Sequence, residues 1–218
     1  MRDRSAPLTK ARVQTLGWEK MEGLVPAIVQ HASTGEVLML GYMNEEALKT
    51  TLDTGFATFF SRSRQRLWEK GETSGNRLKV EGVYNDCDGD ALLVLALPEG
   101  PVCHLGTRSC FEAPQAGPGW LAILSQIIRE RANSGDPSSY TRKLLEEGPE
   151  RIGKKIGEEG VEVALAGVSR DAAGCVEEVA DLLYHVAVLM EARQFGWSDV
   201  ITAMRARHAT ASRSTASS

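Results

Sequence analysis

The chain has 218 residues, enough for one large domain or two domains of ordinary size. A hydrophobic content of 42% and a charged content of 25% are typical of a globular protein and exclude a wholly disordered chain. The net charge of −4 argues against a general nucleic-acid binder, and no apolar run is long enough for a membrane helix. The first residues lack the apolar centre of a secretory signal, so we expect a cytoplasmic protein with reduced cysteines.

Short apolar runs separated by turn signals predict a β-rich first half. In residues 25–43 two such runs surround Ser-Thr-Gly, a pattern typical of a β-hairpin. Residues 44–55 predict a short helix with Asn44 as N-cap and Gly55 after its end. Further strands are predicted at 57–63, 77–86 and 91–98.

Cations and hydroxyl groups are concentrated in the segment SRSRQRLWEKGETSG, residues 61–75. Arginine forks and hydroxyl groups are the usual partners of phosphate oxygens, and such a cluster in an acidic protein favours an anionic substrate. A charged loop without a ligand is the alternative. The candidate substrate-binding residues are Arg62, Arg64, Lys70, Thr73 and Ser74.

The next unusual segment is DCDGD, residues 86–90. An EF-hand is excluded, because its sixth and twelfth positions hold Ala91 and Leu97 in place of Gly and Glu. In an extended strand the three aspartates would share one face and Cys87 would lie on the other. Carboxylates grouped in this way favour Mg²⁺, although a solvated strand end is also compatible with the pattern. The candidate magnesium ligands are Asp86, Asp88 and Asp90.

Three of the four cysteines lie close together in sequence and predict a zinc site. Three thiolates leave a fourth zinc position open for water, and His104 is then placed to move protons or orient hydroxide. In the alternatives, His104 or His31 closes a structural zinc site, His104 only donates a hydrogen bond, or the thiols are merely buried. The candidate zinc ligands are Cys87, Cys103 and Cys110, whereas Cys175 is interpreted as a small core residue.

The composition changes at residues 113–119, which are rich in Pro and Gly and predict a linker. We therefore expect an α+β, β-rich domain over residues 1–112 and an all-helical bundle over residues 120–208. The small, polar residues 209–218 predict a disordered tail. Helical periodicity covers 121–133, 138–147, 149–168, 173–194 and 198–208, the last with Ser198 as its cap.

Acidic residues interrupt the apolar faces of two of these helices. In residues 151–168 Glu159 shares the apolar face, and the next helix carries a polar stripe that ends at His185. A buried carboxylate is costly unless it is paired or metal-bound, and facing carboxylates in a bundle commonly hold metals. Solvated faces with ordinary ion pairs are the alternative. The candidate Mg²⁺ ligands are Glu158, Glu159, Glu162, Glu178 and Asp181.

Most of residues 20–111 resembles phosphoribosyl-AMP cyclohydrolase of histidine biosynthesis. The motifs SRSRQRLWEKGETSGN, NDCDGDALLVL and GPVCHLGTRSCF carry the resemblance and occur in the family's order. It implies a zinc site that takes Cys87 from the partner subunit of a homodimer, and magnesium on the three aspartates. It also implies hydrolytic opening of the adenine ring. Phe60 departs from the family, in which Trp is expected.

Residues 120–208 resemble phosphoribosyl-ATP pyrophosphohydrolase, one of the all-α nucleotide pyrophosphohydrolases. The motifs are GEEGVEVALA and EEVADLLYH, preceded by SSYTRKLLEEGPERIGKK. The resemblance implies Mg²⁺ on the five carboxylates, catalysis at Glu159 and a phosphate contact from Lys155. Gly160 stands where Ala is expected, at a cost of about 1 kcal/mol in a helix.

The two resemblances name consecutive steps and together predict a bifunctional hydrolase. Its expected partners are small phosphoribosyl-adenine nucleotides and a second copy of the chain, with neither nucleic acid nor membrane. Two other functions stay open. One is a housecleaning nucleotide pyrophosphatase whose first domain only binds zinc. The other is a non-catalytic, zinc-stabilised dimerisation module joined to a helical partner-binding domain.

Overall fold

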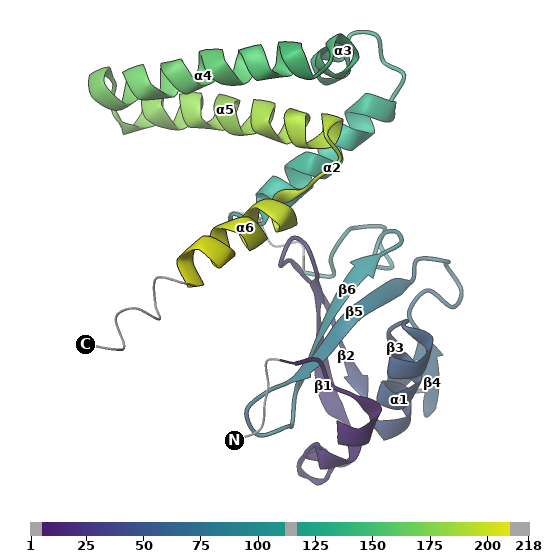
Figure 1. The fold of residues 1–218 in the computed structure, drawn as a ribbon. Coiled ribbons are helices and arrows are strands. Elements are labelled where there is room, and N and C mark those ends of the chain that lie inside the picture. Colours follow the sequence, from purple (N-terminus) through teal and green to yellow (C-terminus); the bar gives the residue numbers. More distant parts are fainter. Residues whose placement is uncertain (1–5, 112–116, 210–218) are drawn as a thin grey trace, which may run out of the picture. The chain divides into compact units, whose positions relative to one another are not determined.

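The computed structural model describes residues 6–111 and 117–209, and only the backbone of Ala209. Residues 113–116 of the predicted linker and 210–218 of the predicted tail lie outside the described residues. The chain divides into two compact units, Met1–Gly119 and Trp120–Ser218. The first is built on a β-sheet and the second is helical (Figure 1), which confirms the predicted fold class. No described helix is both long and apolar enough to cross a membrane.

A four-stranded sheet forms the frame of the first unit, with the strand order β2-β1-β6-β5. β1 pairs antiparallel with β2, as predicted for the hairpin, but it pairs parallel with β6, and β6 pairs antiparallel with β5. The last strand of the sheet therefore lies in its centre, beside the first. The strands are β1 (Val25–His31), β2 (Val37–Met43), β5 (Leu78–Asn85) and β6 (Leu92–Pro98).

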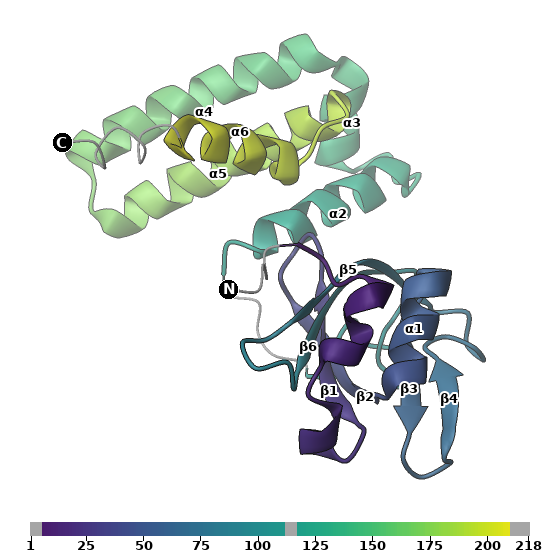
Figure 2. The same cartoon turned by 60° about the horizontal axis from the view of Figure 1, so that its bottom comes forward.

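The two faces of the sheet differ in burial. Val25, Ala27 and Val29 of β1 are fully buried in the core that includes Ala47 and Leu48 of the covering helix α1, residues Glu45–Thr54 (Figure 2). On the opposite face Ile28 is 39% exposed, and its cross-strand partner Leu40 is 45% exposed. Because these two apolar residues alternate with buried ones, the second face is apolar and open within this single chain.

Helix α1 (Glu45–Thr54) forms for the local reasons that the sequence predicts. The Asn44 side chain accepts the Ala47 N–H at 2.8 Å, and Gly55 ends the helix with a left-handed φ of 74°. Three further elements were not predicted: β4 (Arg66–Glu69), which forms a hairpin with β3 (Thr58–Ser61), and the 3-10 helices η1 (Lys10–Thr15) and η2 (Trp18–Met21).

The second unit is built around the antiparallel helices α4 and α5, which lie side by side in both views (Figures 1 and 2). Helices α2 and α3 pack against this pair around Ile128, Leu144, Ile152 and Val188. Asp171 caps α5 by accepting the Gly174 N–H at 2.9 Å. The helices are α2 (Trp120–Asn133), α3 (Tyr140–Glu147), α4 (Pro149–Ser169), α5 (Ala172–Ala192) and α6 (Trp197–Ala209).

Candidate active sites

A pocket of about 540 Å³ lies beside the β3–β4 hairpin of the first unit. It brings together two groups of residues that the sequence predicted separately, the phosphate-binding candidates and part of the thiol site. Arg62 is not among the lining residues, because its guanidinium lies 4.0 Å from the centre of the Tyr42 ring. The candidates that line the pocket are Arg64, Lys70, Thr73, Ser74, His104 and Cys110.

The wall of this pocket depends on the unpredicted strand β4. Trp68 lines the pocket and lies opposite Phe59 of β3, with ring centres 5.2 Å apart. Arg66 pairs with Glu72 at 2.7 Å, and this hydrogen bond lowers the pKa of Glu72. Sequence reasoning missed both Trp68 and Glu72 as pocket residues. The apolar pair Leu-Trp inside a run of charges was the available signal for a short strand.

Two of the three candidate zinc ligands lie together. Cys103 is buried, and its sulfur lies 3.8 Å from His104 Nδ1. Cys110 is exposed, yet partial desolvation and, next, the nearby Cys103 raise the pKa of its thiol. A thiol that resists ionisation beside a second thiol suits a site in which a cation balances the charge of the two sulfurs.

The loop that carries these thiols is fixed to β2. The Cys110 N–H donates to Leu38 O at 2.8 Å, and the Ser109 hydroxyl donates to Val37 O at 2.8 Å. Arg108 pairs with the buried Glu36 at 3.1 Å. These hydrogen bonds and the ion pair therefore fix the part of the loop that carries Cys110.

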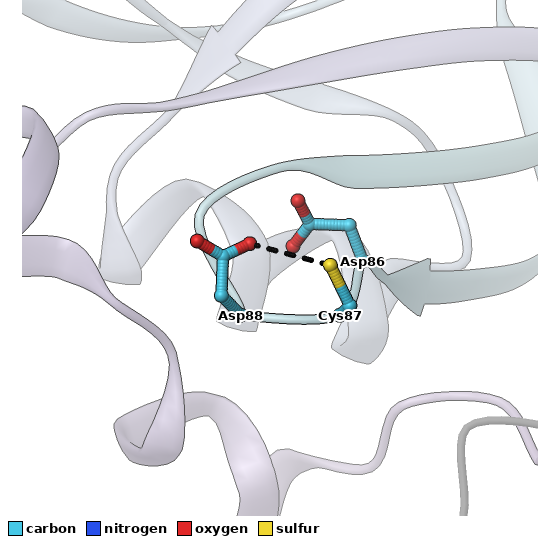
Figure 3. A group of neighbouring side chains, drawn as sticks. All are labelled: Asp86, Cys87 and Asp88. Atoms are coloured by element: carbon cyan, nitrogen blue, oxygen red, sulfur yellow. Dashed lines mark hydrogen bonds between the residues drawn. The ribbon is translucent and has the colours of Figure 1, made fainter.

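Cys87 does not join the other two thiols. It belongs to a separate group with Asp86 and Asp88, whose ligand atoms all lie within 4.8 Å of one another (Figure 3). Among the described residues, the three thiols do not form one such group. Cys87 is exposed, and His31, the alternative closing ligand, is also outside both potential metal groups.

The segment 86–90 is a turn between β5 and β6 and not a strand, so the predicted alternation of side chains is wrong. Asp86 causes the difference. Its Oδ1 accepts the N–H groups of Gly89, Asp90 and Ala91 at 2.9, 3.0 and 3.3 Å. Gly89 adopts a φ of 79°, which extended backbone does not allow. One Asp86 oxygen is thus used to hold the turn.

Lys20 of η2 already neutralises part of this acidic turn. Its Nζ lies 2.7 Å from Asp88 Oδ2 and 3.5 Å from Asp90 Oδ2. The hydrogen bond to Lys20 lowers the pKa of Asp88, whereas desolvation and the neighbouring aspartates raise that of Asp90. All three aspartates lie in one turn, and a lysine from the N-terminal segment offsets part of their negative charge.

The carboxylates of the second unit gather between α4 and α5. Glu159, Glu178 and Asp181 each offer an oxygen within 4.8 Å of the others, and the first two are buried. Glu162 also lies beside them. A hydrogen bond with Glu178 and the negative charges of Glu159 and Glu178 raise the pKa of Glu162. Glu158 is exposed and pairs with Lys155 at 2.9 Å.

Two cations border this cluster. Lys155 Nζ lies 3.6 Å from Glu159 Oε1, and Arg170 pairs with Glu178. The lysine thus stands at the edge of the acidic group, where the sequence predicted a phosphate contact. Cys175 is only partly buried, so its interpretation as a core residue is wrong. It lies in the first turn of α5 and is not among the residues of the bundle core.

The chain matches two family models in succession. One, described as phosphoribosyl-AMP cyclohydrolase, matches residues 39–112, and the other, described as phosphoribosyl-ATP pyrophosphohydrolase, matches residues 121–208. The curated histidine biosynthesis bifunctional protein HisIE of Yersinia pestis is 50% identical over 201 residues, which are 92% of this chain and 98% of that protein. Its namesakes from Salmonella typhimurium and Escherichia coli K12 are each 51% identical over 203 residues, 92% of this chain and 99% of theirs.

Proposed function

The chain belongs to the family of bifunctional histidine-biosynthesis hydrolases that join a phosphoribosyl-AMP cyclohydrolase to a phosphoribosyl-ATP pyrophosphohydrolase, and from this premise we propose how its two sites act. We assign residues 1–112 to the cyclohydrolase, 113–119 to a linker and 120–208 to the pyrophosphohydrolase. The second domain acts first and cleaves phosphoribosyl-ATP to phosphoribosyl-AMP and pyrophosphate. The first domain then opens the adenine ring of that product, so chain order is opposite to reaction order.

The pocket beside the β3–β4 hairpin is the proposed cyclohydrolase site, and its lining is the observation that carries the proposal. Arg64, Lys70 and the hydroxyls of Thr73 and Ser74 can hold the phosphates of the nucleotide there. The adenine ring then lies toward His104 and Cys110 on the same wall. Arg62, held over Tyr42, contributes by positioning the hairpin or by turning toward a bound phosphate.

Cys103 and Cys110 fit two positions of a thiolate zinc site, and Cys87 of the partner subunit supplies the third. When bound, zinc lowers the pKa of a water ligand to about 7 and so supplies hydroxide. His104, beside Cys103, would orient the attacking water toward the ring carbon that bears the amino group. Asp86, Asp88 and Asp90 are the proposed Mg²⁺ ligands. An oxygen of Asp86 and an oxygen of Asp88 lie within 4.8 Å of each other, and Lys20, which contacts Asp88 and Asp90, is the competing cation.

The carboxylate cluster between α4 and α5 is the proposed pyrophosphohydrolase site. Glu159, Glu178 and Asp181, with Glu162 and Glu158 at the border, are the residues that hold Mg²⁺. When bound, Mg²⁺ would neutralise phosphate charge and polarise water near the α–β link. Glu159 would accept the proton of the attacking water, and Lys155 at the edge of the cluster would hold the phosphates.

A homodimer follows from the same residues. Cys87 is exposed and separate from the other two thiols, so a zinc site with three thiolates needs a second chain. The open, apolar sheet face around Ile28 and Leu40 is a surface that a second copy can cover. A stripe of α4, Val161, Leu165 and Val168, is exposed as well and supports a second contact in the helical unit.

The test is one assay with two single-residue variants. Purified protein with phosphoribosyl-ATP and Mg²⁺ should release pyrophosphate and then develop the ultraviolet absorption of a ring-opened purine. Glu159→Gln should reduce pyrophosphate release by roughly 10²–10³-fold and leave ring opening of added phosphoribosyl-AMP unchanged. Cys103→Ala should do the opposite and lose zinc, whereas Cys175→Ala, the matched control, should keep both activities and its zinc.

The results also separate the other two functions. Turnover of non-canonical nucleoside triphosphates without a ring-opened product would make the chain a housecleaning pyrophosphatase. Loss of stability but not of any activity in Cys103→Ala would make the zinc structural. Either result contradicts the proposal.

A further inference from the structure

The pocket beside the β3–β4 hairpin has an apolar wall as well as a charged one. Met39 and Val102 are buried, and they line the pocket together with Trp68. Among the described residues that line the pocket, Trp68 alone is aromatic. A pocket that is charged on one side and apolar on the other suits a ligand that carries both a phosphate and a flat, weakly polar ring.

Trp68 is supported from behind by two neighbouring strands. Phe59 of β3 is fully buried and pairs directly opposite Trp68, with ring centres 5.2 Å apart and an angle of 33° between the ring planes. Behind Phe59, Gly41 of β2 leaves the space that this ring occupies, because a Cβ on Gly41 would overlap it. Close packing of β2 and β3 therefore restrains the indole of Trp68.

The spacing along β4 suits a nucleotide. Lys70 extends the pairing of the hairpin, since its N–H donates to Ala57 O at 3.0 Å. Side chains two residues apart in an extended chain lie on the same side, roughly 7 Å from each other. Trp68 and Lys70 both line the pocket, as this alternation requires. A ribose can span such a separation, so one nucleotide can place its base against Trp68 and its phosphate at Lys70.

We propose, on the basis of the function proposed for this pocket, that Trp68 is the platform on which the purine ring of the nucleotide stacks. Phe59 covers one side of the indole, and the other side is the part that meets the ligand. A purine that lies with one face on Trp68 leaves its opposite face to the attacking water. The reaction opens the six-membered ring of the purine, so the product keeps a smaller flat surface and is held less tightly.

Variants of Trp68 separate stacking from support of the pocket. Trp68→Phe keeps a smaller aromatic ring, whereas Trp68→Leu keeps an apolar side chain and loses the aromatic surface. Trp18→Phe is the matched control. Trp18 packs against the same core, but its indole N–H donates to Val13 O at 2.9 Å and it lines a different pocket.

Two probes are titrated into the full chain by calorimetry. AMP carries adenine, and ribose 5-phosphate carries the same phosphate without a base. Trp68→Leu should weaken AMP binding roughly 10–100-fold, whereas Trp68→Phe should weaken it by at most about threefold and Trp18→Phe should leave it unchanged. Ribose 5-phosphate should bind all four proteins with affinities within about twofold of one another, because Arg64 and Lys70 are intact in each.

Tryptophan fluorescence adds a readout that a purely structural role would not change. A purine stacked on an indole quenches its emission. AMP should therefore quench the unchanged protein more than Trp68→Phe, and ribose 5-phosphate should quench neither. AMP that binds to the helical unit affects Trp120 and Trp197 equally in both proteins, so its effect cancels in the comparison.

Each outcome decides for or against the platform. Equal weakening of AMP and ribose 5-phosphate binding in Trp68→Leu would make Trp68 a structural support of the pocket and overturn the inference. Equal quenching of the unchanged protein and Trp68→Phe by AMP would overturn it as well. A protein that stacks AMP on Trp68 but never opens the ring of phosphoribosyl-AMP would instead refute the function proposed for the pocket and leave the stacking in place.

Discussion

His31 gives a prediction about pH at the scale of a single residue. Its Nδ1 accepts the Ser33 and Thr34 N–H groups at 3.1 and 3.3 Å, and burial, followed by the charge of Arg108, lowers its pKa. The unfolded chain therefore binds a proton below about pH 6.5 that the folded chain resists. Stability should be insensitive to this group above pH 7 and should fall as the pH drops through 6.5.

The measurement is the melting temperature between pH 7.5 and 5.5. His31→Asn keeps a side-chain oxygen as acceptor for the turn but cannot titrate, so its melting temperature should fall less than that of the unchanged protein. His208→Asn, in the exposed last turn of α6, is the control and should follow the unchanged protein. Equal pH slopes for all three proteins would contradict the role given to His31.

Single residues also show which functional features a sequence can reveal on its own. Glu159 was predicted on an apolar helix face and is buried, because the helical period alone sets that position. Asn44 was predicted as a cap and is one, since the bond to Ala47 is local. The hydrogen bond between Tyr140 and His185 joins residues 45 positions apart, and no local pattern could indicate it. Trp68 was missed because its partner Phe59 lies across a hairpin.

Secondary-structure elements were predicted well where the controlling contacts are local and poorly where they are not. The β1–β2 hairpin and the four longest helices follow from periodicity and turn residues. The aspartate turn does not, because alternation of side chains assumes an extended backbone, and Asp86 captures three N–H groups that a strand would use otherwise. A side chain that accepts hydrogen bonds from nearby backbone N–H groups competes with the hydrogen bonds of a regular strand. The conformation of such a segment depends on which of the two sets of hydrogen bonds is more stable.

Asp86 is therefore expected to stabilise the turn apart from any metal. Asp86→Ala should lower the free energy of unfolding by about 1–3 kcal/mol in chelator, because three N–H groups lose a charged acceptor. Asp86→Asn keeps an oxygen at that position and should cost less. Denaturant titration of both variants measures the difference. An Asp86→Ala protein as stable as the unchanged chain would show that the turn forms without this carboxylate.

The open face of the sheet gives a second prediction about elements. Leu40→Lys places a charge where Leu40, 45% exposed in the single chain, is proposed to meet a second copy. Losing the burial of one Leu costs about 1.5–3 kcal/mol, so the dissociation constant of the dimer should rise roughly 10–100-fold. Sedimentation analysis measures the association, and bound zinc should fall with it. Glu81→Lys on β5 is exposed as well and serves as the control. A Leu40→Lys protein that stays dimeric would exclude this face.

At the scale of the whole molecule, the chain is two self-contained units in series. One core gathers residues of β1, β2, α1 and β6, and the other gathers residues of α2 to α5. Neither core shares a residue with the other. The candidate sites follow the same division, since each described group of potential metal ligands and the pocket beside the β3–β4 hairpin draw on one unit only.

Residues 1–119 and 120–218, produced as separate proteins, should therefore each fold and keep one activity. Each should melt cooperatively, and the helical piece alone should release pyrophosphate from phosphoribosyl-ATP. Addition of the sheet-containing piece should then restore ring opening at a rate proportional to its concentration. Failure of either piece to fold by circular dichroism would mean that the units depend on each other for stability.

The parallel pairing of β1 with β6 has a consequence for synthesis on the ribosome. Because β6 inserts between β1 and β5, the sheet cannot close until Pro98 has left the exit tunnel. Until then the emerging β1–β2 hairpin carries an unpaired edge next to apolar side chains, a form prone to join other nascent chains. The long-range pairing also slows folding relative to the helical unit. A chaperone acting early in translation would therefore protect the first site far more than the second.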